Sequence, residues 1–147
     1  MAVKGAPLKL TIHVDGGARG NPGPAAAGVV IMDAEKTVLH EAGIFLGEAT
    51  NNVAEYRALL AGMQAAERLG ATEVEILSDS QLLVRQMQGL YRVKSDNLRS
   101  LHDEALLLQG RFARCSFRHI SREENKHADK LVNRAINLRR NVEDLAV

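Results

Sequence analysis

Residues 8–24 read LKLTIHVDGGARGNPGP, an alternating pattern that runs into a cluster of glycines and prolines. Apolar and polar residues alternate from Leu8 to Asp15, which predicts a strand with one buried face. The segment from Gly16 to Pro24 is dominated by turn formers, so we expect a loop there. Asp15 is therefore expected at the end of a buried strand, next to two glycines.

Two further strands are expected after this loop, followed by a change to helical spacing. Ala26 to Met32 and Thr37 to Leu46 are strand-like, and their short links predict an antiparallel meander with the first strand. Beyond Thr50, apolar residues recur every three and four positions, which predicts an amphipathic helix that ends at Gly70. The remaining segments are expected to be a strand over Glu73 to Leu77, helices over Gln81 to Met87 and Ser95 to Leu108, a strand over Arg111 to Ile120 and a helix over Glu124 to Leu138.

The order of these elements predicts the fold class. A strand followed by a helix and another strand implies a right-handed crossover and parallel pairing. The expected fold is α/β, a five-stranded mixed sheet of three antiparallel and then parallel strands, flanked by helices. The 147 residues suit one domain over residues 1–147, with a core at about 8–138 and short tails.

The composition is that of a folded protein. Because 46% of the residues are hydrophobic and 25% are charged, a disordered chain is not expected. No apolar run is long enough to span a bilayer and Met1 to Lys9 lack a signal-peptide pattern, so we expect a cytoplasmic protein with no membrane partner. Cys115 is the single cysteine, which excludes an internal disulfide, and is expected to be a small packing residue.

Charge is unevenly distributed along the chain, although the net charge is only +1. Up to Val84 there are 6 Lys and Arg residues against 10 Asp and Glu, a balance of −4; from Arg85 onward there are 13 against 8, a balance of +5. This asymmetry fits a metal site in one part and a polyanion-binding surface in the other. Asymmetry of this size also arises by chance, so charge alone leaves both interpretations open.

Four acidic residues occupy positions that a purely structural role explains poorly. They are Asp15, Glu55, Asp79 and Asp129. Carboxylates at the ends of buried strands or beside the apolar stripe of a helix pay a desolvation cost unless a positive group holds them. Taken singly, each has an ordinary explanation as a turn residue, a helix cap, a first-turn acid or a solvated helix residue. If the four meet, divalent ions such as Mg²⁺ or Mn²⁺ would relieve their repulsion, whereas no Cys–His spacing suggests zinc.

Four segments resemble, in order and spacing, the motifs of the type 1 ribonuclease H family. They are VDGGARGNPGP at residues 14–24, TNNVAEYRAL at 50–59, SDSQ at 78–81 and REENKHAD at 122–129, the last in the form of archaeal and related bacterial members. The resemblance covers almost the whole chain, from Leu8 to Leu138, and implies the ribonuclease H-like fold. It implies that two Mg²⁺ ions, or Mn²⁺ in their place, are bound by Asp15, Glu55, Asp79 and Asp129. The implied reaction is endonucleolytic hydrolysis of the RNA strand of an RNA–DNA hybrid, leaving a 5′-phosphate and a 3′-hydroxyl.

The same resemblance implies a set of substrate-binding residues. Asn21, Asn52 and Gln81 match positions that contact nucleic acid across the minor groove, where amides suit base edges and 2′-hydroxyls. Thr50 together with Asn21 resembles the family's pocket for a DNA-strand phosphate. Asn21 and Asn52 also suit a turn and a helix cap, so both interpretations stay open. The other expected contacts are Gly16, Gly17, Asn51, Ser80 and Lys94.

The segment before the last motif departs from the better-known bacterial members. Those carry a glycine-rich loop with a His, whereas residues 118–122 read RHISR without glycine. Either Arg122 or His119 is therefore expected to assist product release or proton handling, and the match to the archaeal-like members favours Arg122.

The basic protrusion of some members is also missing. The interval from Gln88 to Leu108 is short, and only Arg92, Lys94 and Arg99 are candidates for phosphate contacts. Each of the three also has an ordinary explanation as a solvated surface charge. Binding is expected to depend on phosphate contacts and groove shape, and therefore to weaken with salt.

Two alternative functions remain at this stage. Related folds serve transposases, integrases and junction resolvases, but the Asn-containing motifs and the small size argue against them. A non-catalytic binding module is the other alternative, and the four acids argue against it. The expected partner is an RNA–DNA hybrid from primers or R-loops, with double-stranded RNA as a second candidate substrate, and the expected state is a monomer.

Overall fold

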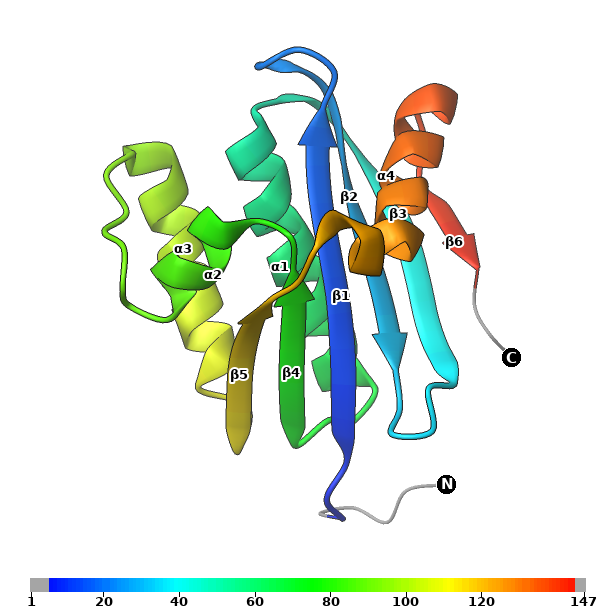
Figure 1. The fold of residues 1–147 in the computed structure, drawn as a ribbon, viewed down its shortest axis with the longest axis vertical. Helices are drawn as coiled ribbons and strands as arrows, with labels where there is room; N and C mark the ends of the chain where they lie inside the picture. The colour runs from blue at the N-terminus through cyan, green and yellow to red at the C-terminus, as the bar shows by residue number, and fades with distance from the viewer. Residues whose placement is uncertain (1–5, 145–147) are drawn as a thin grey trace.

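A mixed sheet of six strands forms the centre of the computed structural model, which describes residues 6–144 (Figure 1). The strand order across the sheet is β5-β4-β1-β2-β3-β6. The strands are β1 (Lys9–Ala18), β2 (Gly23–Met32), β3 (Val38–Ala49), β4 (Glu73–Ser78), β5 (Arg114–His119) and β6 (Val142–Asp144). The first three form the expected antiparallel meander, and β4 and β5 run parallel to β1.

Helices cover both faces of this sheet. They are α1 (Asn51–Arg68), α2 (Gln81–Met87), α3 (Asp96–Gln109) and α4 (Lys126–Leu138), the last preceded by a 3₁₀ turn over Arg122–Asn125. On β2, Ala27 and Val29 belong to the main core with α1 and α3, whereas Ala26 and Val30 belong to clusters with α4. The alternation of strand side chains thus places α1 and α4 on opposite faces (Figure 1).

Glycines bring these helices unusually close to the sheet, and two of them, Gly16 and Gly28, do so beside Asp15. A Cβ atom on Gly16 would lie 2.2 Å from the backbone carbon of Ala54 in α1, and a Cβ on Gly28 would lie 2.3 Å from the backbone oxygen of Ala128 in α4. Both distances are far shorter than any real contact, so only glycine permits this approach. Gly28 pairs directly with Asp15 across the β1–β2 ladder, so both helices touch the sheet beside that residue.

The glycine-rich segment corrects our prediction of a loop from Gly16 to Pro24. Strand β1 continues through Ala18 and β2 begins at Gly23, so the link is only residues 19–22. Gly16 pairs with Ala27, and Ala18 with Ala25. The glycines and prolines predicted a loop because such residues favour turns locally. Their pairing in strands depends on residues that are distant in the sequence. Asp15 lies within β1 and not at its end.

The strand count also differs from the prediction, because β6 makes a sixth strand. It pairs antiparallel with β3 over only three residues, too few to show an alternating pattern. The helix expected from Glu124 begins at Lys126, and β5 is shorter than the expected strand over Arg111 to Ile120.

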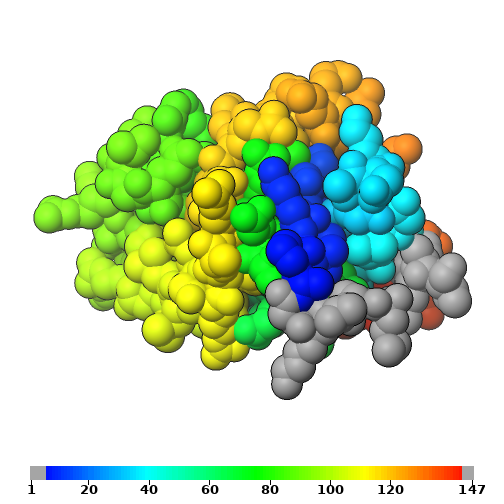
Figure 2. All heavy atoms as spheres, turned by 90° about the horizontal axis from the view of Figure 1, so that it is seen from below, coloured from blue at the N-terminus to red at the C-terminus, as the bar shows by residue number. Residues whose placement is uncertain are grey.

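The lower end of the sheet carries the starts of β1, β3, β4 and β5. Viewed from below, the starts of β5, β4 and β1 and the β2–β3 link lie side by side (Figure 2).

Cys115, in β5, is half-buried and packs against the main core, as expected. Among the described helices, none has the length and apolarity to cross a membrane.

Candidate active site

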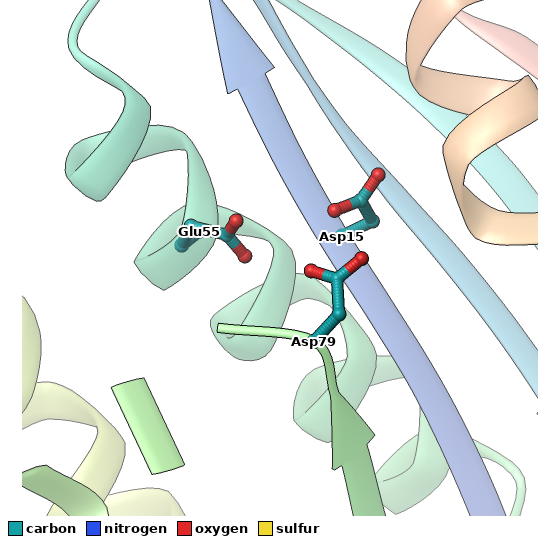
Figure 3. A group of neighbouring side chains, drawn as sticks. All are labelled: Asp15, Glu55 and Asp79. Carbon is teal, nitrogen blue, oxygen red and sulfur yellow. The ribbon is translucent and has the colours of Figure 1, made fainter. Parts of the chain in front are cut away.

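Three carboxylates from different parts of the chain meet at one point. Asp15 lies in β1, Glu55 in α1, and Asp79 directly after β4. One oxygen of each lies within 4.8 Å of the others, and Figure 3 shows the three side chains turned toward one another. Asp129, in the first turn of α4, lines the same cavity, whose volume is about 420 Å³.

The backbone explains why these residues meet. Strands β1 and β4 are parallel and in register up to Val14 and Ser78, so the next residues, Asp15 and Asp79, lie side by side. The glycine contacts described above hold Ala54 and Ala128 against the sheet, and each is followed directly by an acid of the cluster. The four carboxylates thus meet because parallel pairing and two glycine contacts place their backbones together.

The charged forms of these carboxylates are disfavoured when no cation is bound among them. Burial and the charges of Asp79 and Asp129 raise the pKa of Asp15 to about 8, and the residue is only 7% exposed. Burial, followed by the charges of Asp15 and Asp79, raises the pKa of Glu55 well above its usual range. Burial raises the pKa of Asp79 as well, although Arg122 and a hydrogen bond with Asn125 oppose the shift.

An unpaired atom indicates what would relieve this repulsion. Glu55 Oε2 is buried and has no hydrogen-bond partner among the described residues. A buried carboxylate oxygen without a donor is costly, and hard divalent cations prefer such oxygen ligands. The residues present therefore fit a divalent metal ion held by carboxylates alone.

Asn125 belongs to the site and was missed by the sequence analysis. Its Nδ2 donates to the backbone oxygen of Val14 at 2.8 Å, its side chain hydrogen-bonds with Asp79, and it is 1% exposed. It therefore ties the 3₁₀ turn before α4 to β1, next to Asp15. Only its position in the fourth motif could have indicated this role, because nothing in its neighbours distinguishes it from a helix-surface amide.

Both candidates for an assisting residue lie close to Asp79. Arg122 lines the cavity, and its charge opposes the rise in the pKa of Asp79 and of Glu55. His119 ends β5, and its Nε2 lies 3.3 Å from the backbone oxygen of Asp79. The position of Arg122 in the cavity agrees with the preference for it, and the choice between the two stays a prediction.

The β1–β2 link is tied to the start of α1 by asparagines. Asn21 Oδ1 accepts from the backbone N–H of Asn51 at 3.0 Å, and Asn51 Oδ1 accepts from Ala18 N–H at 2.8 Å. Thr50 is the N-cap of α1, because its hydroxyl accepts from the Val53 N–H at 3.2 Å. Asn52 is therefore not the cap, and its side chain is exposed.

The other expected substrate contacts divide by location. Gly16, Gly17 and Ser80 line the cavity, although the hydroxyl of Ser80 also caps α2 by accepting from Leu83 N–H. Gln81 is exposed at the start of α2. Lys94 lies outside this cavity, in a separate hollow between α2 and α3.

Comparison with known proteins identifies the family. A family model described as reverse transcriptase-like matches residues 13–135. The chain is 47% identical over 130 residues to the bifunctional protein Rv2228c of Mycobacterium tuberculosis, covering 88% of this chain and 36% of that one. It is 39% identical over 128 residues to ribonuclease HI of Halobacterium salinarum, covering 87% and 64%. The chain thus spans about a third of the length of the first relative and less than two thirds of the second.

Solved structures agree with this relationship. The N-terminal RNase H domain of Rv2228c superposes with a TM-score of 0.86 at 47% identity, covering 88% of this chain and 99% of that one. LC11-RNase H1, solved in complex with an RNA/DNA hybrid, superposes with a TM-score of 0.85 at 44% identity, covering 88% and 98%. With four motifs, a shared fold and this level of identity, the chain belongs to the type 1 ribonuclease H family.

Proposed function

We propose that this domain is an endoribonuclease that hydrolyses the RNA strand of RNA–DNA hybrids with the help of two divalent ions. The observation that carries the proposal is the cluster of Asp15, Glu55 and Asp79, in which a buried Glu55 oxygen has no hydrogen-bond partner within residues 6–144. The relative LC11-RNase H1 has been solved with an RNA/DNA hybrid, which supports the choice of substrate.

The four carboxylates would hold the ions, Mg²⁺ by preference and Mn²⁺ as a substitute. Bound there, divalent ions supply an activated water and stabilise the leaving 3′ oxygen of a phosphodiester. The protein's own contribution is to hold the acids close together before substrate arrives. Arg122 contributes a cation next to Asp79, where it would assist product release or proton handling.

The substrate would be recognised mainly through its backbone and minor groove. Asn21, Asn52 and Gln81 offer amides to 2′-hydroxyls and base edges, and Thr50 at the start of α1 offers a phosphate site. Double-stranded RNA is a second candidate substrate. We further propose that residues 1–147 act as one domain, as a cytoplasmic monomer, in removing RNA from primers and R-loops.

The test is a cleavage assay on four labelled duplexes of one sequence: hybrid, double-stranded RNA, double-stranded DNA and a hybrid with a single ribonucleotide. We expect cutting of the hybrid's RNA strand with Mg²⁺ and none with chelator. Asp79→Asn should lower the cleavage rate at least ~100-fold without unfolding the protein, because the amide keeps the shape but not the charge of the carboxylate. Asp103→Asn, on the exposed surface of α3, is the control that should retain full activity.

The outcomes separate the alternatives. Hybrid binding without cleavage under any divalent ion would support a non-catalytic module and contradict the proposal. Cleavage of duplex DNA would indicate the transposase and resolvase chemistry of related folds. Activity of Asp79→Asn above a few per cent of the parent would show that the carboxylate cluster is not the catalytic centre.

A further inference from the structure

The cavity that contains the carboxylates also reaches a second polar cluster, between the β1–β2 link and α4. The Arg19 guanidinium donates to Asn137 Oδ1 at 2.5 Å and to Asn133 Oδ1 at 3.4 Å. Arg19 and Asn133 both line the cavity. None of the roles proposed above uses this cluster, and the motif resemblance assigned no function to its members.

The position of this side chain is fixed at both ends. The backbone N–H of Arg19 donates to Pro24 O at 2.8 Å, which closes the link between β1 and β2. Asn133 is itself held, because its Nδ2 donates to the backbone oxygen of Asp129 at 3.1 Å. The guanidinium is therefore oriented by the same helix turn that carries an acid of the site.

The charge of Arg19 is oriented but not neutralised. Its two acceptors are uncharged amide oxygens, and within residues 6–144 it forms no salt bridge. A guanidinium has five N–H donors, so several remain for a ligand. Its planar fork matches phosphate oxygens, and an exposed, pre-oriented guanidinium is suited to bind one with little loss of side-chain entropy.

We propose that Arg19, oriented by Asn133 and Asn137, binds a phosphate of the RNA strand at a short distance from the phosphate that is cleaved. This inference rests on the proposed function and adds a substrate-binding residue to it. Asn133 and Asn137 lie four and eight residues beyond Asp129, about 6 and 12 Å along the helix axis. With a rise of roughly 3.4 Å per nucleotide, the contacted phosphate lies two or three nucleotides from the one at the carboxylates.

The first experiment measures binding, not cleavage. Hybrid affinity is determined by fluorescence anisotropy over a salt series with Mg²⁺, in an Asp79→Asn background that does not cut. Arg19→Gln should weaken binding roughly fivefold to tenfold, the scale of one charge-assisted hydrogen bond, and lower the slope of log K against log salt by about 0.7 to 0.9. Arg114→Gln is the matched control, because Arg114 is exposed and is the first residue of β5. Strand β5 begins at the lower end of the sheet (Figure 2).

The second experiment locates the phosphate. Hybrids that carry one uncharged methylphosphonate linkage, moved stepwise along either strand, are compared for the parent and for Arg19→Gln. We expect one RNA linkage, two or three nucleotides from the cut, where neutralisation weakens binding of the parent but not of the variant. In cleavage-competent protein, Arg19→Gln should raise KM by the same factor and leave kcat unchanged, because the contact is equally strong before and during reaction.

The results either support or overturn the inference. An unchanged salt slope, an unchanged response at every RNA linkage, or a sensitive linkage on the DNA strand would overturn it. If Arg19→Gln lowers the melting temperature, Arg19→Lys keeps the charge and should restore the salt slope but not the full affinity, whereas a purely structural role predicts no dependence on charge. Failure of the parent to cut any hybrid would overturn the proposed function, while the binding comparison would still test Arg19.

Discussion

Two effects disfavour the charged form of the Asp15 side chain, namely burial and the nearby charges of other carboxylates. The residue is buried, and Asp79 and Asp129 lie close to it, so its pKa is raised to about 8. The unfolded chain carries neither cost. Between the ordinary pKa of 3.8 and about 8, the folded state binds more protons at Asp15 than the unfolded chain does. Without metal, the stability of the protein should therefore decrease as the pH rises through this window.

Asp15→Asn should remove the loss of folding stability that the charged Asp15 carboxylate causes at high pH. In chelator at about pH 8, we expect the variant to melt at least ~3 °C above the parent, because an amide pays no like-charge repulsion. Near pH 4 the two melting temperatures should converge, since the parent carboxyl is then protonated as well. Thermal melting across the pH range measures the effect, and a variant no more stable than the parent at pH 8 would contradict it.

Arg122 and His119 both lie near Asp79, but they differ in their position relative to the cavity. Arg122→Ala should slow turnover by roughly tenfold or more and exceed the effect of His119→Ala, because only the former of the two lines the cavity. Steady-state and single-turnover rates on one hybrid separate product release from hydrolysis. The reverse ordering of the two variants would assign the assisting role to His119.

At the scale of the elements, the position of α4 depends on the absence of side chains at Gly28 and Gly43, of which Gly28 lies opposite Asp15. Gly28→Ala would place a Cβ 2.3 Å from the backbone oxygen of Ala128, so the helix must move away from the sheet and carry Asp129 with it. We expect a loss of roughly 2 kcal/mol or more of stability and at least a tenfold loss of cleavage rate.

Gly110→Ala is the control for this substitution. Its Cβ would meet only ordinary contacts, the nearest at 3.5 Å, at a backbone conformation that any residue adopts. Thermal melting and cleavage of both variants test the argument. Full activity of Gly28→Ala would show that the approach of α4 to the sheet does not position Asp129.

Elements with strong periodicity were predicted well from the sequence, and those defined by distant contacts were not. The helix after Thr50 is as expected, because spacing and capping act locally, although it ends at Arg68, two residues before Gly70. The extension of β1 through Ala18 was missed, since glycines pair there only because Ala25 to Ala27 lie opposite. The contacts of Asn125 with Val14 and of Arg19 with Asn137 were missed for the same reason, because each joins residues more than a hundred positions apart.

At the scale of the whole molecule, metal binding and folding are linked. Divalent ions that bind only the folded state stabilise it by mass action, and they also remove the repulsion among the carboxylates. We therefore expect Mg²⁺ to raise the melting temperature more at about pH 8 than at about pH 5, where protons compete for the same oxygens. Melting with Mg²⁺ and with chelator measures this, and Asp79→Asn should lose most of the difference.

The two glycine contacts have a consequence for how the molecule tolerates change. Where Gly16 and Gly28 meet α1 and α4, backbone atoms touch backbone atoms, and no side chain acts as a spacer. The separation of the acids is then independent of which apolar residues fill the interior elsewhere. Substitutions of core residues should therefore lower the melting temperature well before they change the separation of the acids.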